Sequence, residues 1–244
     1  MRNLMQKTSV TALLALAVLA PWSSAKTTVD QLKFLQPGSV EYVKILPPAA
    51  DLKSPEMKQE FETLLRVQQN RSAEEVERAK SEITLTVAAF APVLGPDFKI
   101  DSLPKTAALF KQLDLESKFF TGPAKDFYNR LRPTFVDSRI QSAVETEQEP
   151  AYPSGHATRG MLFALTLAEI EPQKRGAILA RGVEIGWDRV ILGVHYPSDV
   201  AAGRAMGMAL FAQLQKSAAF KTALADAKAE VGSVASAAPV GAQH

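Results

Sequence analysis

Hydrophobic residues recur at helical spacing along most of this chain, whereas the alternating runs that are typical of strands are scarce. In the strongest run, residues 153–170, apolar side chains occupy nearly the whole circumference of a helix. Such all-round apolarity predicts a helix buried at the centre of the molecule. Pro172 ends it, a second helix is expected over residues 173–192, and a last long helix from Ser198, its N-cap, to about residue 229. The pattern therefore predicts an all-α fold.

Polar caps mark the start of two earlier helices. Ser54-Pro55 fits an N-cap followed by a proline in the first helical turn. Ser72 and Glu75 fit a capping box, in which each side chain accepts a hydrogen bond from the backbone N–H of the other residue. We therefore expect two consecutive helices within residues 54–89.

The first 25 residues have the layout of a secretory signal peptide. Arg2 and Lys7 precede an apolar run over residues 10–20, and residues 23–25 are small, as they are before a cleavage site. The apolar run is too short to span a bilayer as a helix, which takes about 20 apolar residues. We expect cleavage after Ala25 and a periplasmic or secreted protein, with an uncleaved N-terminal anchor as the alternative.

The rest of the chain is long enough for one hydrophobic core. Of the 244 residues, 46% are hydrophobic, so residues 26–230 are expected to form a single domain, followed by a disordered tail at 231–244. Loss of Arg2 and Lys7 lowers the number of basic residues from 28 to 26, which equals the 26 acidic residues. A neutral protein lacks the basic field that binds nucleic acid or anionic lipid, although a local cationic pocket is compatible with neutrality. The chain has no cysteine and therefore no disulfide.

The candidate chemistry is concentrated in residues 151–199. This stretch holds two of the chain's 3 histidines, and the third is the last residue. Ser154 and Gly155 open the apolar helix, where free backbone N–H groups and the positive end of the helix dipole favour an anion. The two runs that carry the histidines are Pro153-Ser154-Gly155-His156 and Arg189-x5-His195-x3-Asp199.

Two cations precede this stretch. Helices are expected at residues 102–113 and 123–132, separated by Gly122-Pro123, and Lys125 and Arg132 lie seven residues apart on the second of them. Two helical turns place both side chains on roughly the same face, from which they can converge on one anion. Arg189 adds a third positive charge, and the guanidinium fork matches tetrahedral oxyanions.

The three motifs together resemble the signature of the type 2 phosphatidic acid phosphatase (PAP2) superfamily, and a chain of this size is similar to the bacterial class A nonspecific acid phosphatases. The resemblance implies a single-domain helical bundle of the PAP2/vanadium haloperoxidase type. It also implies a metal-independent acid phosphatase without cofactors, which hydrolyses small phosphate monoesters of many kinds. The motifs are Lys125-x6-Arg132-Pro133, Pro153-Ser154-Gly155-His156 and Arg189-x5-His195-x3-Asp199.

The resemblance also implies a role for each residue. His195 would attack phosphorus and form a phosphohistidine, while Asp199 accepts a hydrogen bond from its other ring nitrogen. His156 would protonate the leaving oxygen and then activate water. The phosphoryl oxygens would be bound by cationic side chains and the helix start, namely Lys125, Arg132, Ser154, Gly155 and Arg189.

Acidic residues near the motifs raise separate questions. Asp188 precedes Arg189, where the family usually has serine, and its carboxylate could either repel phosphate or orient the arginine. Between the motifs lie Glu145, Glu147 and Glu149, which fit a solvated loop better than the lining of an entrance. Their spacing alone does not tie them to the chemistry.

Two other function classes share these residues. A vanadium-dependent haloperoxidase would bind vanadate where phosphate binds, but the short chain favours the phosphatase. A noncatalytic phosphate-binding protein would not need His156, His195 and Asp199 together. In the favoured interpretation the partners are small phosphate monoesters, with no nucleic acid and no stable membrane association after signal cleavage. The sequence leaves open whether the protein forms a homo-oligomer.

Overall fold

The computed structural model describes residues 26–96 and 98–237, and every regular element within these ranges is a helix. This confirms the predicted all-α fold. The signal-peptide prediction for residues 1–25 lies outside the described residues. None of the described helices is long and apolar enough to span a bilayer. The α-helices are α1 Tyr42–Ile45, α2 Pro55–Asn70, α3 Ala73–Ser81, α4 Ala91–Leu94, α5 Pro104–Tyr128, α6 Pro133–Val136, α7 Gly155–Ile170, α8 Arg175–Ile191, α9 Pro197–Leu214 and α10 Ala218–Ala237.

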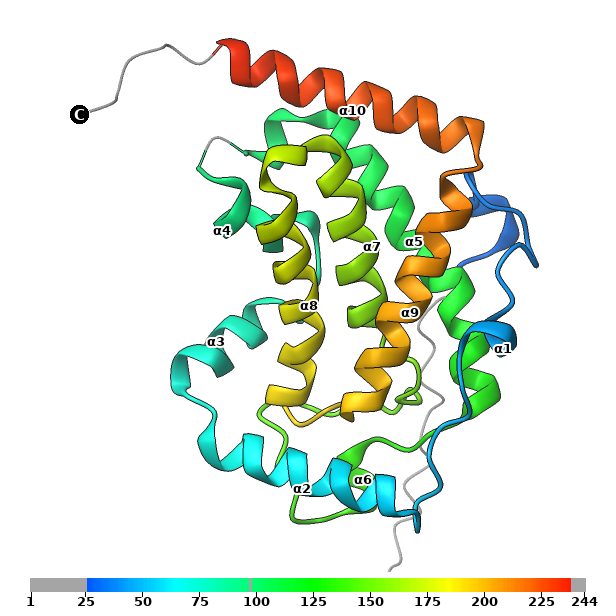
Figure 1. Cartoon of the computed structure of the whole chain (residues 1–244), viewed down its shortest axis with the longest axis vertical. Helices are drawn as coiled ribbons and strands as arrows, with labels where there is room; N and C mark the ends of the chain where they lie inside the picture. The colour runs from blue at the N-terminus through cyan, green and yellow to red at the C-terminus, as the bar shows by residue number, and fades with distance from the viewer. Residues whose placement is uncertain (1–25, 97, 238–244) are drawn as a thin grey trace, which may run out of the picture.

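Helix α7 is the central element of the fold, as its apolar sequence predicts. It packs along its length against α8 and α9, with α5 on another side (Figure 1). Glycines allow the close approach of the three helices. A Cβ at Gly182 of α8 would lie 2.5 Å from the Ala164 Cβ, and one at Gly203 of α9 would lie 2.5 Å from the Ser154 carbonyl oxygen. A side chain at either position would force the neighbouring helix to shift, so the two glycines set how closely α8 and α9 pack on α7.

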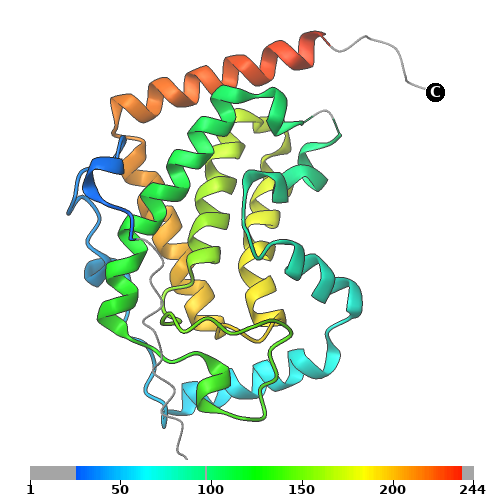
Figure 2. The same ribbon diagram turned by 180° about the vertical axis from the view of Figure 1, so that it is seen from behind.

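Four helix ends gather at the end of the bundle opposite α10 (Figures 1 and 2). They are the last turns of α5 and α8 and the first turns of α7 and α9. The connection from α6 to α7 runs across the same end (Figure 2). Because each sequence motif lies at one of these helix ends, the fold brings residues from distant parts of the chain to one place.

The predicted break at Gly122-Pro123 is wrong, because α5 continues through Pro123 to Tyr128. A proline inside a helix removes one hydrogen bond and costs about 3 kcal/mol. Here Phe120 and Ala124, on either side of it, are buried in the protein. Packing of this face outweighs the cost of the proline. The helix ends instead at Asn129, which adopts a left-handed conformation with φ of 43°.

The last long helix is two helices rather than one, and its N-cap is Tyr196 rather than Ser198. Residues 215–217 turn the chain between α9 and α10, and the Ser217 hydroxyl accepts a hydrogen bond from the Phe220 N–H. Helix α10 then crosses the end of the bundle on α5 and α7 (Figure 1). The helix extends to Ala237, so it includes residues 231–237 of the tail that was predicted to be disordered, while 238–244 lie outside the described residues.

The predicted caps of the first two long helices are confirmed. The Ser54 hydroxyl accepts from the Met57 N–H at the start of α2, and Ser72 and Glu75 form the capping box of α3. Helix α3 ends at Ser81, earlier than residue 89, and the chain continues through a non-helical segment. The Glu82 and Ile83 carbonyl oxygens of this segment contact His156.

Candidate active site

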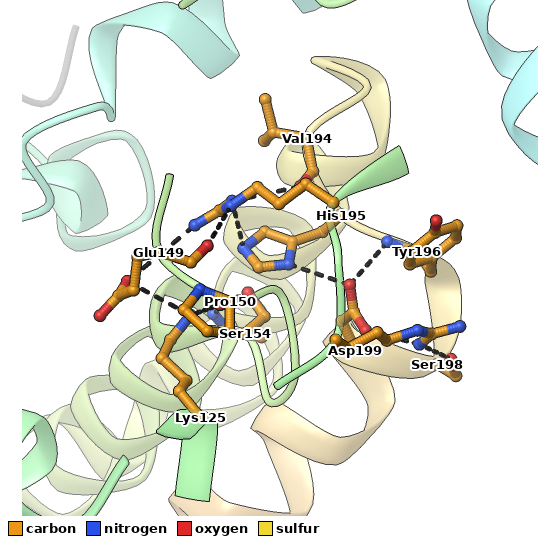
Figure 3. Close-up of polar contacts among 12 residues, drawn as sticks. Lys125, Glu149, Pro150, Ser154, Val194, His195, Tyr196, Ser198 and Asp199 are labelled. Carbon is orange, nitrogen blue, oxygen red and sulfur yellow. Dashed lines mark hydrogen bonds and ion pairs between the residues drawn. The ribbon is translucent and has the colours of Figure 1, made fainter. Parts of the chain in front are cut away.

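His195 and Asp199 lie at the start of α9 and are both buried. The chain turns into the helix between them, so that the Asp199 carboxylate folds back toward the preceding residues. Its Oδ2 accepts a hydrogen bond from the Tyr196 N–H at 2.9 Å and lies 3.1 Å from His195 Nδ1 (Figure 3). The helix cap and the contact with the imidazole thus use the same carboxylate oxygen, which fixes the ring relative to the helix.

The tautomer of His195 follows from its second contact. Arg132 Nη1 lies 3.1 Å from His195 Nε2, and a guanidinium can only donate hydrogen bonds. Nε2 must therefore carry the lone pair, and Nδ1 carries the proton that points to Asp199. Burial lowers the pKa of His195 well below its ordinary value, and the nearby charges of Arg132 and Lys125 lower it further. His195 is thus a neutral imidazole whose unprotonated Nε2 accepts a hydrogen bond from Arg132.

Arg130 is a buried partner of this pair that the sequence analysis missed. Its Nη1 lies 2.6 Å from Asp199 Oδ1 and its Nη2 lies 2.6 Å from Glu60 Oε2, while its guanidinium stacks on the Tyr196 ring at 4.0 Å. Burial raises the pKa of Asp199, and the charge of Arg130 opposes this rise. The sequence held a signal for Arg130. Pro133 disfavours helical backbone before it, and in an extended segment Arg130 and Arg132 point to the same face.

Lys125 and Arg132 converge, but not in the way that the sequence predicts. Lys125 lies in the last turn of α5, whereas Arg132 lies beyond the helix in extended backbone, so they do not share a helix face. Both nevertheless reach Glu149, whose Oε2 is 3.3 Å from Lys125 Nζ and 4.0 Å from Arg132 Nη2. Lys125 Nζ also donates to the Pro150 carbonyl at 2.5 Å (Figure 3). Burial lowers the pKa of Lys125, and Glu149 opposes this effect.

The start of α7 lies beside these cations. Ser154 is its N-cap, and the hydroxyl accepts from the Ala157 N–H at 3.3 Å. A Cβ at Gly155 would lie 4.0 Å from the Lys125 Cε, so the N-terminal turn of α7 adjoins the lysine side chain. Ser154 also donates its backbone N–H to the Asp199 carbonyl at 3.0 Å, which joins the starts of α7 and α9.

His156 lies in the first turn of α7 and faces the segment after α3. Its Nε2 is 3.1 Å from the Glu82 carbonyl oxygen and 3.2 Å from that of Ile83, so Nε2 carries the proton in this arrangement. Burial lowers the pKa of His156 well below its ordinary value, and the charges of Arg189 and Arg159 lower it further. Without a bound anion, the neutral form of His156 is therefore favoured.

Arg189 occupies the last turn of α8 and is buried. Its Nη2 donates to the Ala79 carbonyl at 2.5 Å, whereas its buried Nε has no hydrogen-bond partner within the described part of the chain. A buried donor without a partner is costly, and an anion in the site can satisfy it. The charge of Arg189 reaches both histidines, because it lowers the pKa of each.

The Asp188 carboxylate pairs with arginines other than Arg189. It lies 2.8 Å from Arg78 Nη2 and 3.8 Å from Arg181 Nη1. Arg78 of α3 and Arg181 of α8 thus neutralise the Asp188 carboxylate. Asp188 contributes a buried ion pair to the packing of these helices, and its hydrogen bonds do not go to Arg189.

The three acidic residues lie in an exposed, irregular connection, as predicted, but two of them also contact the cations of the site. Glu147 bonds to Arg132 Nη2, and Glu149 contacts both Arg132 and Lys125. Glu145 is exposed, as expected. Among the residues that the structure describes, no group of three or more His, Asp or Glu side chains could hold a metal ion.

Comparisons with known proteins agree with this site. Residues 115–221, which include all three motifs, match the model of the PAP2 superfamily. The chain is 37% identical over 147 residues to the non-specific acid phosphatase of Salmonella typhimurium, covering 58% of this chain and 59% of that protein. It is 29% identical over 224 residues to the non-specific acid phosphatase of Salmonella typhi, covering 88% and 85%.

A solved structure shares the fold. A bacterial vanadium-dependent iodoperoxidase superposes with a TM-score of 0.55 at 17% sequence identity, covering 73% of this chain and 53% of that chain. At this identity the likeness concerns the arrangement of helices alone. The family model matched over residues 115–221 and the two phosphatase relatives independently agree with the resemblance to the PAP2 superfamily.

Proposed function

We propose that this protein is an exported acid phosphatase of broad specificity, which hydrolyses phosphate monoesters through a phosphohistidine intermediate. The observation that carries the proposal is the state of His195, whose Nε2 lone pair lies beside Arg132 while its Nδ1 proton points to Asp199. A neutral nitrogen nucleophile surrounded by cations is what attack on a phosphoryl dianion requires. The non-specific acid phosphatases to which the chain is similar support the same reaction class.

In the first step, His195 Nε2 attacks phosphorus. A P–N bond forms, the bond from phosphorus to the leaving oxygen breaks, and His156 gives that oxygen a proton. Lys125, Arg132 and Arg189 bind the three remaining oxygens, on which charge is spread in the transition state. Asp199 stabilises the positive charge that develops on the imidazole of His195.

In the second step, water attacks the phosphohistidine. His156 takes a proton from the water, the P–N bond breaks, and inorganic phosphate leaves while His195 returns to its neutral form. Because positive side chains stabilise the phosphoryl charge, this scheme uses neither a metal nor a cofactor. The N-terminal turn of α7, with Ser154 and Gly155, adds a partial positive charge next to Lys125.

The proton that His156 donates is the one on Nδ1. Its Nε2 proton is shared with the carbonyl oxygens of Glu82 and Ile83, so the ring is held by that nitrogen. Nδ1 gains a proton only in the imidazolium form, which burial and the nearby arginines disfavour in the free protein. A bound phosphoryl dianion has the opposite effect and favours the imidazolium. The imidazolium formed in the complex can then transfer its Nδ1 proton to the leaving oxygen.

Export rests on the N-terminal sequence and on the similarity to the phosphatases. We infer that the mature protein begins near Lys26 and acts in the periplasm or the medium on small phosphate esters. Peptide mapping of the exported protein tests this inference. A mature N-terminus at Lys26 is expected, and intact Met1 in a membrane fraction would show that the apolar run is an anchor.

The decisive experiment is hydrolysis of 4-nitrophenyl phosphate by the mature protein in the presence of EDTA. Turnover without a metal, inhibition by vanadate and a phosphoenzyme that is lost in His195→Ala are the expected results, because vanadate mimics the five-coordinate transition state. Activity that requires an added divalent ion contradicts the mechanism. Oxidation of halide by peroxide in vanadate would indicate a haloperoxidase, and phosphate binding without turnover would indicate a binding protein.

A further inference from the structure

The connection from α6 to α7 places two carboxylates on the cations that are proposed to bind phosphate. Glu147 bonds to Arg132 Nη2, and Glu149 Oε2 lies 3.3 Å from Lys125 Nζ. The side chains of Lys125 and Arg132 are only 5% and 2% exposed, whereas those of Glu147 and Glu149 are 47% and 45% exposed. The cations are thus fixed inside the protein, while the carboxylates reach them from the solvent side.

A carboxylate and a phosphoryl group make the same demands on these cations. Both are anions whose oxygens accept hydrogen bonds from guanidinium and ammonium groups in similar geometry. The other nitrogens of Arg132 already have protein partners, since Nε donates to the Glu149 carbonyl at 2.9 Å and Nη1 contacts Val194 and His195. Nη2 is therefore the nitrogen of Arg132 at which one anion can replace another. In the free protein Glu147 occupies the position that a phosphoryl oxygen would take.

The backbone of the connection is anchored independently of the two carboxylates. The Glu149 and Pro150 carbonyl oxygens accept from Arg132 and Lys125, and the Ala151 N–H donates to the Arg130 carbonyl at 2.8 Å. The carboxylates can consequently rotate into solvent without release of the backbone, because their side chains are half exposed. Exchange of anions at the site requires only changes of side-chain rotamer.

We propose that Glu147 and Glu149 are internal competitors for the phosphoryl group and set the affinity of the site for phosphate esters. In the free protein they neutralise Lys125 and Arg132, and on substrate binding the phosphoryl oxygens replace them. Separation of the carboxylates from Lys125 and Arg132 costs free energy, and this cost reduces the net binding free energy of the phosphoryl group. An unfavourable conformational equilibrium weakens apparent affinity in the same way. This inference deepens the proposed function and rests on it for the identity of the ligand.

Glu145 offers a matched control in the same connection. It carries the same charge and is exposed, and no hydrogen bond or ion pair joins it to Lys125 or Arg132 in the described structure. Glu145→Gln therefore changes the net charge of the loop as much as Glu147→Gln or Glu149→Gln does. It removes no contact with the cations.

The test measures binding of inorganic phosphate to the mature protein by isothermal titration calorimetry, together with KM for 4-nitrophenyl phosphate. We expect Kd for phosphate to fall about threefold in each of Glu147→Gln and Glu149→Gln and roughly tenfold in the double variant, with parallel falls in KM, while Glu145→Gln matches the wild type. The single variants keep one carboxylate on the cations, so they remain informative if the double variant does not fold.

Three results would overturn the proposal. Unchanged phosphate binding in Glu147→Gln and Glu149→Gln would show that the carboxylates do not compete with the ligand. Weaker binding would show that they hold the cations in place for it. An equal gain in Glu145→Gln would show that only the net charge of the loop matters. Calorimetry measures phosphate binding independently of turnover. If the two variants bind phosphate more tightly than the wild type but no form of the protein hydrolyses an ester, the proposed function is refuted and this inference stands.

Discussion

Replacement of Arg130 by methionine tests the electrostatic support of the His195–Asp199 pair. Arg130 is buried between two carboxylates, with 2.6 Å contacts to both Asp199 and Glu60. Methionine keeps much of the apolar stem of the side chain but removes the charge and all five N–H donors. The variant therefore leaves two acidic side chains facing each other in the core without their shared cation.

The structure sets the size of the effect. Removal of one partner from a buried ion pair costs about 3–5 kcal/mol, and Arg130 serves two such pairs. For a chain of this length each kcal/mol lowers Tm by about 2–4 °C, so we expect a fall on the order of 10 °C. The loss of stability in Arg130→Met should also depend on pH. Burial raises the pKa of Asp199, Arg130 opposes the rise, and its removal raises that pKa further.

The sign of the pH dependence follows from linkage. A carboxyl group whose pKa is higher in the folded than in the unfolded protein costs stability when it is ionised. The destabilisation of Arg130→Met is therefore fully present above the raised pKa of Asp199. It shrinks as the pH falls through that pKa toward the ordinary aspartate value, because a protonated Asp199 needs no cation.

The assay is urea denaturation of the mature wild type and variant at pH 7.5 and pH 4.5. Arg139→Met is the control, since Arg139 makes a bidentate ion pair with Asp137 at the surface and its loss should change stability little. A smaller difference between Arg130→Met and wild type at pH 4.5 than at pH 7.5 is expected. An equal difference at both pH values, or none at pH 7.5, would refute the assigned role of Arg130.

Three further predictions concern catalysis and packing. His156→Ala should lose less activity on 4-nitrophenyl phosphate than on an alkyl phosphate, because nitrophenolate leaves without a proton; an identical loss would exclude His156 as the acid. Because burial and Arg189 lower the pKa of His156, the alkaline limb of kcat/KM in a steady-state pH profile should lie below neutrality. Arg159 also lowers this pKa, so Arg159→Met should move the limb to higher pH. Gly203→Ala should cost about 1–3 kcal/mol in urea denaturation, since its Cβ would meet the Ser154 carbonyl, whereas Gly176→Ala, with open space around it, should be tolerated.

The features that the sequence predicted correctly are those encoded over a few residues. The Ser72–Glu75 capping box depends on two side chains three positions apart, and the burial of α7 depends on apolarity around one helix. The helix ends that the prediction missed are set by packing between distant segments. Nothing local to Pro123 shows that its neighbours are buried in the protein, and nothing local to Ser217 shows that α10 must turn onto α5 and α7.

The missed residues of the site have the same explanation. Arg130 meets Asp199 and Glu60 across separations of 69 and 70 residues, so no pattern along the chain pairs them. Glu147 and Glu149 lie in an irregular connection, where spacing carries no information about direction. Their role appears only when the end of α5 and the connection before α7 are placed side by side. Sequence motifs identify the residue types of the chemistry, but the ion pairs that tune it are tertiary.

The two histidines share one electrostatic environment, yet the proposed mechanism asks opposite protonation states of them. Burial and the surrounding cations lower the pKa of both. For His195 this is a direct advantage, because it keeps Nε2 unprotonated for attack. For His156 it favours the neutral form, in which Nδ1 carries no proton to donate. The phosphoryl dianion resolves the conflict, since it neutralises the cations that repel a proton from His156. Substrate binding and proton uptake then occur together, and the acid is formed only in the complex where a leaving oxygen can receive its proton.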